Sequence, residues 1–187
     1  GVNVTLRRGE LRPRSGITQF NATNLNNRPM GCTQYRKADG TPFLLAATTA
    51  RVWRYDTSWL DITGTLLSGT ADTPVRFALL EFGTPATVHV VITNEADAPR
   101  RWDGVAATET TVAGTPPKWT DIISDGSRII GIVPPYEVRW GENLTLDVWP
   151  ALNSRFLAET PGRVRAIRPL GIGGFVVYKE DSIWNGL

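Results

Sequence analysis

The sequence predicts an all-β protein made of antiparallel β-propeller-like repeats, with about four visible blades. Helical periodicity is weak, and apolar residues instead fall in short β-branched runs bounded by Gly, Pro, Asn, Asp and Thr. One unit, an apolar run followed by a turn and a second strand centred on tryptophan, occurs four times. The units recur every 40–50 residues or so, which is the spacing of propeller blades. A two-sheet sandwich would not repeat this unit at a fixed phase.

The expected strands follow one another in four units along the chain. They are 43–47, 51–54 and 59–62 in the first unit, 75–82, 88–92 and 99–104 in the second, 119–123, 129–133 and 138–140 in the third, and 164–170, 175–178 and 182–184 in the fourth. Tight-turn pairs at 39–40, 125–126 and 173–174 lie between strands and supply the glycine that hairpins favour. Because 187 residues provide only about four blades, we expect either an incomplete propeller or one that partner chains complete.

Seven tryptophans are the most informative residues of the composition. Four of them occupy the same phase of the repeat and are expected to pack between blades as its structural core: Trp53, Trp102, Trp140 and Trp184. The other three fall outside that phase and are candidate platforms for stacking a ligand: Trp59, Trp119 and Trp149.

The charge is concentrated at the N-terminus. Residues 1–40 carry seven Arg or Lys against two acidic residues, although the whole chain has a net charge of only +2. We therefore divide the chain into a basic N-terminal arm, 1–30, and a β-propeller-like domain, 31–187. The candidate interface segment of the arm consists of Arg7, Arg8, Arg12 and Arg14. Such an arm suits an acidic protein partner or the DNA backbone.

The composition argues against several kinds of chemistry. With one histidine, His89, and one cysteine, Cys32, the chain has neither an internal disulfide nor the ligands of a zinc site. It contains no phosphate-binding loop of the G-x-x-x-x-G-K-[ST] type. We expect no cofactor, no metal and no enzymatic activity. The apolar runs, about five residues long, are too short to cross a membrane as a helix.

Three segments of the chain resemble a known family. Residues 43–64, residues 88–104 with their P-x-x-W-D-G unit, and residues 163–184 with their P-L-G and K-E-x-S-I-W units are similar to β-propeller-like structural proteins of tailed bacteriophage virions. The resemblance covers about residues 30 to 187. It implies a component of the tail nozzle, tail hub or head-to-tail connector that is located in the virion. From this role, the repeat and the uneven charge, we expect contacts with other virion proteins, a homo-oligomer within the particle, and contact of arginine-rich surfaces with a DNA passage.

Two other functions remain open from the residues alone. A receptor- or glycan-binding module of a phage tail would use Trp59, Trp119 or Trp149 as stacking platforms. A glycoside-cleaving enzyme would need a pair of carboxylates, for which Asp56 and Asp103 are the only candidates at matched positions of the repeat. Both aspartates also suit an ordinary role in turns.

Overall fold

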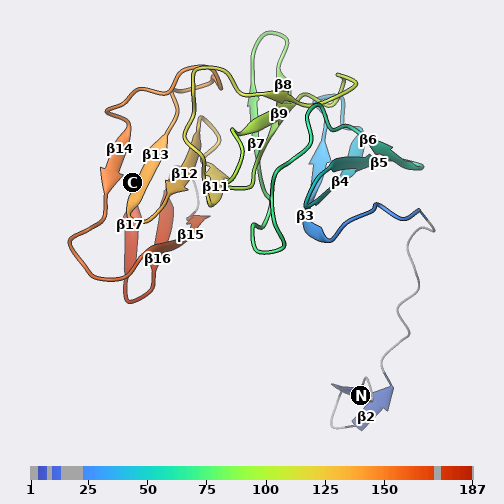
Figure 1. Cartoon of the computed structure of the whole chain (residues 1–187), viewed down its shortest axis with the longest axis horizontal. Helices are drawn as coiled ribbons and strands as arrows, with labels where there is room; N and C mark the ends of the chain where they lie inside the picture. The colour runs from blue at the N-terminus through green and yellow to red at the C-terminus, as the bar shows by residue number, and fades with distance from the viewer. Residues whose placement is uncertain (1–3, 8–9, 14–22, 171–173, 187) are drawn as a thin grey trace.

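The computed structural model describes residues 4–7, 10–13, 23–170 and 174–186. Within these ranges the protein is all-β and contains no helix, and four antiparallel sheets are arranged as the blades of a β-propeller (Figure 1). The fold class predicted from the tryptophan repeat is therefore confirmed. The same part of the chain contains no helix of the length and apolarity needed to span a membrane.

The four blades follow one another along the chain. Their strands are β3 (Pro29–Arg36), β4 (Pro42–Thr48), β5 (Val52–Tyr55) and β6 (Trp59–Asp61) in the first blade; β7 (Arg76–Phe82), β8 (Thr87–Thr93), β9 (Arg100–Trp102) and β10 (Thr110–Thr111) in the second; β11 (Asp121–Ser124), β12 (Ile129–Val133), β13 (Glu137–Trp140) and β14 (Ser154–Phe156) in the third; and β15 (Val164–Pro169), β16 (Phe175–Lys179) and β17 (Ile183–Gly186) in the fourth. A separate antiparallel pair is formed by β1 (Val4–Arg7) and β2 (Glu10–Pro13).

Every strand expected from the sequence is present, and three blade strands were missed. These are the first strand of the first blade, β3, and the fourth strands β10 and β14. Strand β3 has the sequence PMGCTQYR, and Tyr35 is its only buried side chain, so it lacks the apolar run that marked the others. Strands β10 and β14 are two and three residues long, too short for a periodic pattern.

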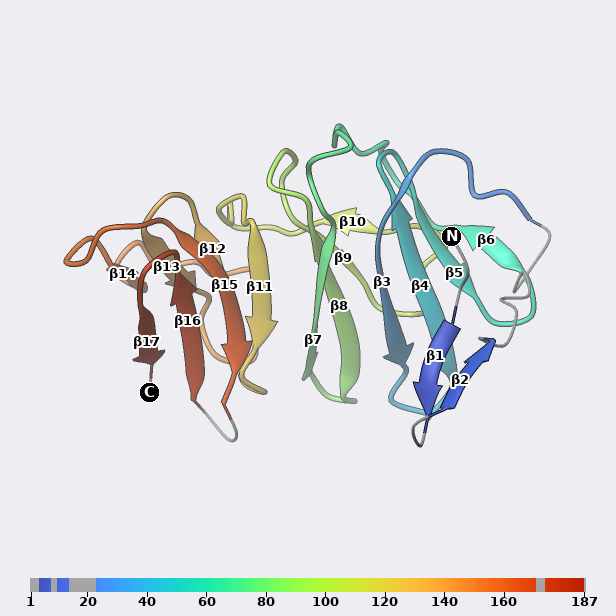
Figure 2. The same cartoon turned by 90° about the horizontal axis from the view of Figure 1, so that it is seen from below.

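Each blade begins at the centre of the molecule and ends at its periphery. Hydrogen bonding runs in sequence order from the first strand outward in all four sheets. The first strands of consecutive blades pack together, β3 on β7, β7 on β11, and β11 on β15, and so define the inner side of the arc (Figure 2). This is the strand order of a propeller, with the sheets side by side around an axis.

The core consists of three apolar clusters, one in each space between consecutive blades. They are the first cluster, with Tyr35, Phe43, Leu45, Ala47, Val52, Ile62, Leu67, Val75, Val90, Ile92 and Trp102; the second, with Ala78, Leu80, Val91, Val112, Trp119, Ile122, Ile129 and Leu146; and the third, with Ile123, Ile130, Ile132, Val138, Leu157, Val164, Ile167 and Val177. Successive residues of β8 and of β12 enter different clusters, because side chains alternate between the two faces of a strand. The middle blades are thus covered on both faces.

Buried polar groups join neighbouring blades to the segments between them. The Arg100 guanidinium donates a hydrogen bond of 2.7 Å to the Glu109 carboxylate and others to the backbone carbonyls of Thr65 and Leu66. The Lys179 ammonium donates to the backbone carbonyls of Leu157 and Thr160. These contacts fix the segments that lead from one blade to the next.

The first and fourth blades lie at opposite ends of the arc (Figures 1 and 2). Among the described residues, no strand of the first blade packs closely on a strand of the fourth. The fourth blade also has three strands where the others have four. The arrangement therefore leaves one face of each end blade without a neighbouring sheet.

Candidate functional site

The outer face of the first blade is an aromatic and apolar surface on which no other described sheet packs. Strand register places its side chains in two rows across the sheet, which are Cys32, Ala46, Trp53 and Asp61, and Gln34, Leu44, Tyr55 and Trp59. The alternate residues of β4 point the other way, into the first cluster. Tyr55 and Trp59 pack together with ring centroids 5.2 Å apart. We call this surface the first face.

The outer face of the fourth blade is uncovered in the same way. Its rows are Ala166, Tyr178 and Ile183, and Arg168, Val176 and Asn185. Tyr178, on the central strand, is 40% exposed and its cross-strand neighbour Ile183, on the edge strand, is 69% exposed, so the two form an apolar patch open to solvent. The alternate residues Phe175 and Val177 turn toward the third blade. We call this surface the fourth face.

The two faces are the two halves of the interface that the chain already repeats three times. Each blade has one side that faces the preceding blade and one side that faces the following blade. At each junction, the following side of one blade packs on the preceding side of the next. The first face is the preceding side of the first blade, and no described blade lies before it. The fourth face is the following side of the fourth blade, and no described blade lies after it. Among the described residues, one face of each kind is therefore left without a neighbouring blade.

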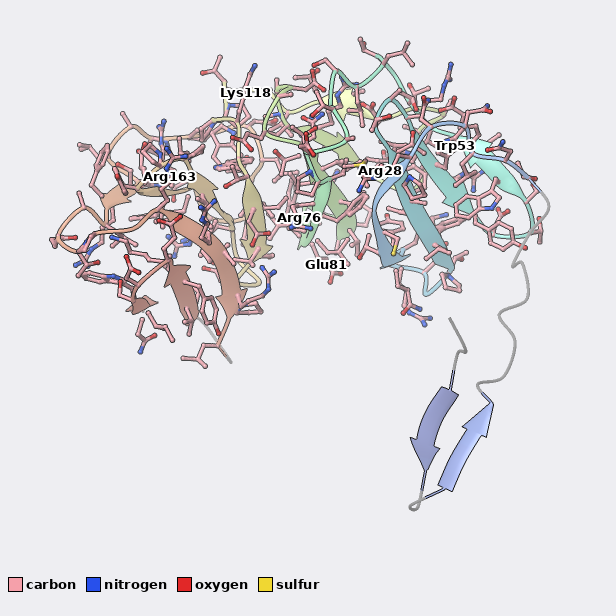
Figure 3. All side chains as sticks on the ribbon, turned by 60° about the horizontal axis from the view of Figure 1, so that its bottom comes forward. Arg28, Trp53, Arg76, Glu81, Lys118 and Arg163 are labelled. Carbon is pink, nitrogen blue, oxygen red and sulfur yellow. The ribbon has the colours of Figure 1, made fainter. Side chains whose placement is uncertain are left out.

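The four tryptophans at the common phase all lie on the third strand of a blade, but on different sides of it. Trp102 is buried in the first cluster against the preceding blade, with its Nε1 donating to the Ala106 carbonyl at 2.8 Å. Trp140 and Trp184 both face the space between the third and fourth blades. Trp53 (Figure 3) lies on the first face, and its buried Nε1 has no hydrogen-bond partner among the described residues.

The three tryptophans outside that phase have different surroundings. Trp119 is 0% exposed and lies flat on Gly131, and it packs on Trp149 with ring centroids 5.0 Å apart. It cannot be the stacking platform predicted for it, because its ring offers no face to a ligand. Trp149 is half-buried and donates from Nε1 to the Leu146 carbonyl at 3.0 Å. Trp59 alone of the three lies on an uncovered sheet face.

The predicted arginine interface lies largely beyond what the structure describes. Arg7 is in β1 and Arg12 is in β2, where Leu6 pairs with Leu11 and Arg7 with Glu10. Arg8 and Arg14 lie outside the described residues. The arm's interface therefore stays a prediction.

A recess of about 340 Å³ lies along the inner strands, lined in part by Cys32, Phe77 and Ile122. A single buried carboxylate, Asp121, organises it. Asp121 accepts hydrogen bonds from the Arg168 guanidinium at 2.6 Å and from the Ile167 amide at 3.1 Å, and Arg76 (Figure 3) approaches it at 3.5 Å. The carboxylate thus ties the inner strands of the second and fourth blades to that of the third.

The candidate catalytic carboxylates are turn residues. Asp56 follows β5 and accepts hydrogen bonds from Thr57, and these contacts lower its pKa. Burial raises the pKa of Asp103, but hydrogen bonds from the amides of Ala106 and Val105 outweigh it and lower the pKa overall. A general acid needs the opposite shift. Within the described ranges, no group of three or more His, Cys, Asp or Glu residues is placed to hold a metal ion.

The composition of the second strands could have indicated the two uncovered faces, although the positions of the strands along the chain could not. An antiparallel strand with one wet face alternates polar and apolar residues, whereas a strand covered on both faces is apolar throughout. Apart from His89, the second strands are apolar in all four blades, FLLAA, VHVVI, IIGIV and FVVY. The middle two are covered on both faces, but the outer two are covered on one.

The fold and these faces define a class of protein, a β-propeller of four blades with an unpaired junction at each end. Comparison of the chain with family models, with curated proteins and with solved structures gives no match.

Proposed function

We propose that the chain is a structural component of a tailed bacteriophage virion, a tail nozzle, tail hub or head-to-tail region protein that acts through protein–protein contacts. The motif resemblance of residues 43–64, 88–104 and 163–184 supports the phage assignment. The two uncovered faces support the mode of action. Other virion proteins, and further copies of this chain, are the partners.

The observation that carries the proposal is the apolar character of the first and fourth faces. Leu44, Tyr55 and Trp53 on one end, and Tyr178 and Ile183 on the other, are arranged in sheet rows like those that bury the clusters between blades. Leu44, Trp53 and Tyr55 are partly exposed and Tyr178 and Ile183 are exposed, and open apolar patches mark protein interaction sites. Each square ångström of apolar surface covered contributes about 25 cal/mol, and because lost translational and rotational freedom opposes association, a stable junction has to cover most of both faces.

The partner that fits the first face best is the fourth face of a second copy. Such a contact joins different surfaces on the two copies, so it is heterologous, and repetition of it closes a ring when the rotation permits. The inner strands would then line a central passage. With the basic arm, 1–30, such a ring suits contact with the phosphate backbone of DNA.

The proposal is tested by the mass of the purified chain in solution and by its presence in particles. We expect a concentration-dependent oligomer. L44E should convert it to a monomer, because the charge would be buried in the junction. L152E is the matched control, since Leu152 is 92% exposed in a loop away from both faces.

In particles, we expect mass spectrometry of purified virions to detect the wild type and L152E at a fixed copy number and L44E at a strongly reduced one. Replacing Arg7, Arg8, Arg12 and Arg14 together by alanine should also reduce incorporation without unfolding the chain. A chain that is monomeric at all concentrations and absent from particles would contradict the proposal.

A further inference from the structure

The space between the third and fourth blades contains a cavity of about 470 Å³. Its walls are the facing sides of two sheets: Ile130, Val138, Trp140 and Arg155 on the third blade, and Phe175 and Trp184 on the fourth. Strand register sets Ile130 opposite Trp140 and Val177 opposite Trp184, so each tryptophan stands at the peripheral side of a core residue. A volume of this size is typical of small-molecule sites.

The other two spaces between blades are filled where this one is hollow. Blades diverge from the axis, so the gap between them widens outward and needs large side chains. Between the first two blades, Trp102 packs on Tyr35 and Phe43 with ring centroids 5.3 Å and 5.8 Å away. Between the second and third, Trp119 and Trp149 fill the gap. In the third space, Trp140 and Trp184 line an opening instead of closing it.

The two tryptophans offer flat apolar surfaces together with a polar group. Trp184 is held in place by an Nε1 contact to Ser182 Oγ at 3.3 Å. Among the described residues, Trp140 Nε1 has no hydrogen-bond acceptor, and it is not buried. Phe175 lies across Gly186, where an added Cβ would come within 2.8 Å of its ring. An aromatic wall with an available N–H suits the apolar face and the hydroxyl edge of a sugar ring.

Charged groups at the rim give the cavity a preference for an anion that also carries hydroxyl groups. The Arg155 guanidinium lies 6.0 Å from the Trp184 ring and forms no ion pair among the described residues. Arg128 contributes a second guanidinium, whose Nε lies 3.2 Å from Asp125. Two guanidinium groups against one carboxylate leave an excess of positive charge.

Asp125 decides which anion fits. Burial raises the pKa of this carboxyl, but hydrogen bonds from the amides of Ser127 and Arg128 outweigh it and lower the pKa, so the group stays ionised. An ionised carboxylate accepts hydrogen bonds from hydroxyl groups and repels a doubly charged phosphate. The cavity therefore favours a polyhydroxylated ligand with a single carboxylate over a nucleotide.

We propose that this cavity binds a carboxylate-bearing oligosaccharide, with a sugar ring stacked on Trp184 and Trp140 and its carboxylate paired with Arg155. Arg128 is held by Asp125, whose Oδ1 already accepts from Ser127 and Arg128, so Oδ2 is the oxygen that accepts a sugar hydroxyl group. The site is independent of the uncovered faces that carry the structural proposal, because it lies between blades three and four.

The test uses the intact chain and isothermal titration with four probes. These are 3′-sialyllactose and trigalacturonate as acidic sugars, lactose as the neutral counterpart of the first, and adenosine monophosphate. We expect saturable binding of at least one acidic sugar, and no saturation by lactose or the nucleotide at the same concentrations. Which acidic sugar binds distinguishes a sialic acid from a uronic acid ligand. Saturation-transfer NMR should place the strongest signals on the ring protons of the stacked sugar.

Two variants and a control locate the site. R155Q should weaken the acidic sugar about tenfold, because it removes one charge-assisted contact. W184F, which keeps an aromatic ring of smaller area, should weaken it less. R163Q changes an exposed arginine of the fourth blade outside the cavity and should bind as the wild type does. Failure of both acidic sugars to bind, tighter binding of adenosine monophosphate, or equal affinity of R155Q and R163Q would overturn the proposal.

Discussion

Breaking the buried ion pair between Arg100 and Glu109 should destabilise the protein severely. The Arg100 side chain is 8% exposed and the Glu109 side chain 1% exposed, with 2.7 Å between Nη1 and Oε1. E109Q keeps the shape of the side chain but leaves the guanidinium without its counter-charge. Loss of one partner of a buried pair costs about 3–5 kcal/mol. Because Arg100 retains the carbonyls of Thr65 and Leu66, we expect a loss near the lower limit, about 3 kcal/mol.

The double variant R100M/E109L separates the contribution of the ion pair to stability from the cost of burying its two charged groups. Well-packed apolar replacements of a buried pair are often neutral or stabilising, so the double variant should be more stable than E109Q. Urea unfolding followed by circular dichroism gives the free energies, and the four proteins of the R100M, E109L cycle give the coupling between the two residues. A loss below about 1 kcal/mol for E109Q, or strictly additive effects in the cycle, would refute the reasoning.

Three further changes probe packing and titration. Burial, and then the nearby carboxylates of Asp103 and Asp39, raise the pKa of Tyr35 to about 12, above its unfolded value of about 10. The contribution of Tyr35 to the free energy of unfolding should therefore be fully present below pH 10 and fall toward pH 12. Y35F should lack this decline. K179M should cost about 2–4 kcal/mol, because it leaves the backbone carbonyls that the ammonium binds without a donor. G131A should cost about 2 kcal/mol, because its Cβ would lie 2.6 Å from Trp119 Cγ.

Urea unfolding measures all three changes, the first at pH 9 and pH 11.5. Equal pH dependence of wild type and Y35F would contradict the assignment of the alkaline transition to Tyr35. A K179M protein as stable as the wild type would show that the buried ammonium contributes no net stability. For G131A, an unchanged tryptophan emission spectrum together with unchanged stability would show that Trp119 can move aside at little cost.

The strands that form the cores of the blades could be predicted from sequence, because they carry apolar runs and a tryptophan at constant phase. Strand β3 could not, because its side chains outside the first cluster are polar and its position depends on pairing with β4. The short strands β10 and β14 exist only because a neighbouring third strand offers free hydrogen-bonding groups.

The candidate sites were less accessible from the sequence. The repeat predicted where tryptophans lie along the chain but not toward which neighbouring blade each one points, since a shift of one residue in register reverses the face. Trp140 thus points toward the following blade, whereas Trp53 and Trp102 both point toward the preceding one, and Trp53 is uncovered because no described blade precedes the first. The cavity beside Trp184 depends on how far two sheets diverge, a distance that no local pattern encodes.

The strictly sequential packing of the blades has a thermodynamic consequence. In the part of the chain that the structure describes, each blade packs closely only on its neighbours in sequence, so stability is close to a sum of blade terms and nearest-neighbour junction terms, as in a linear array. The end blades have one junction each and should open first, which predicts amide hydrogen exchange that is fastest at both ends and slowest in the second and third blades. Closure into a ring would give every blade two junctions, and fraying would become a single cooperative transition.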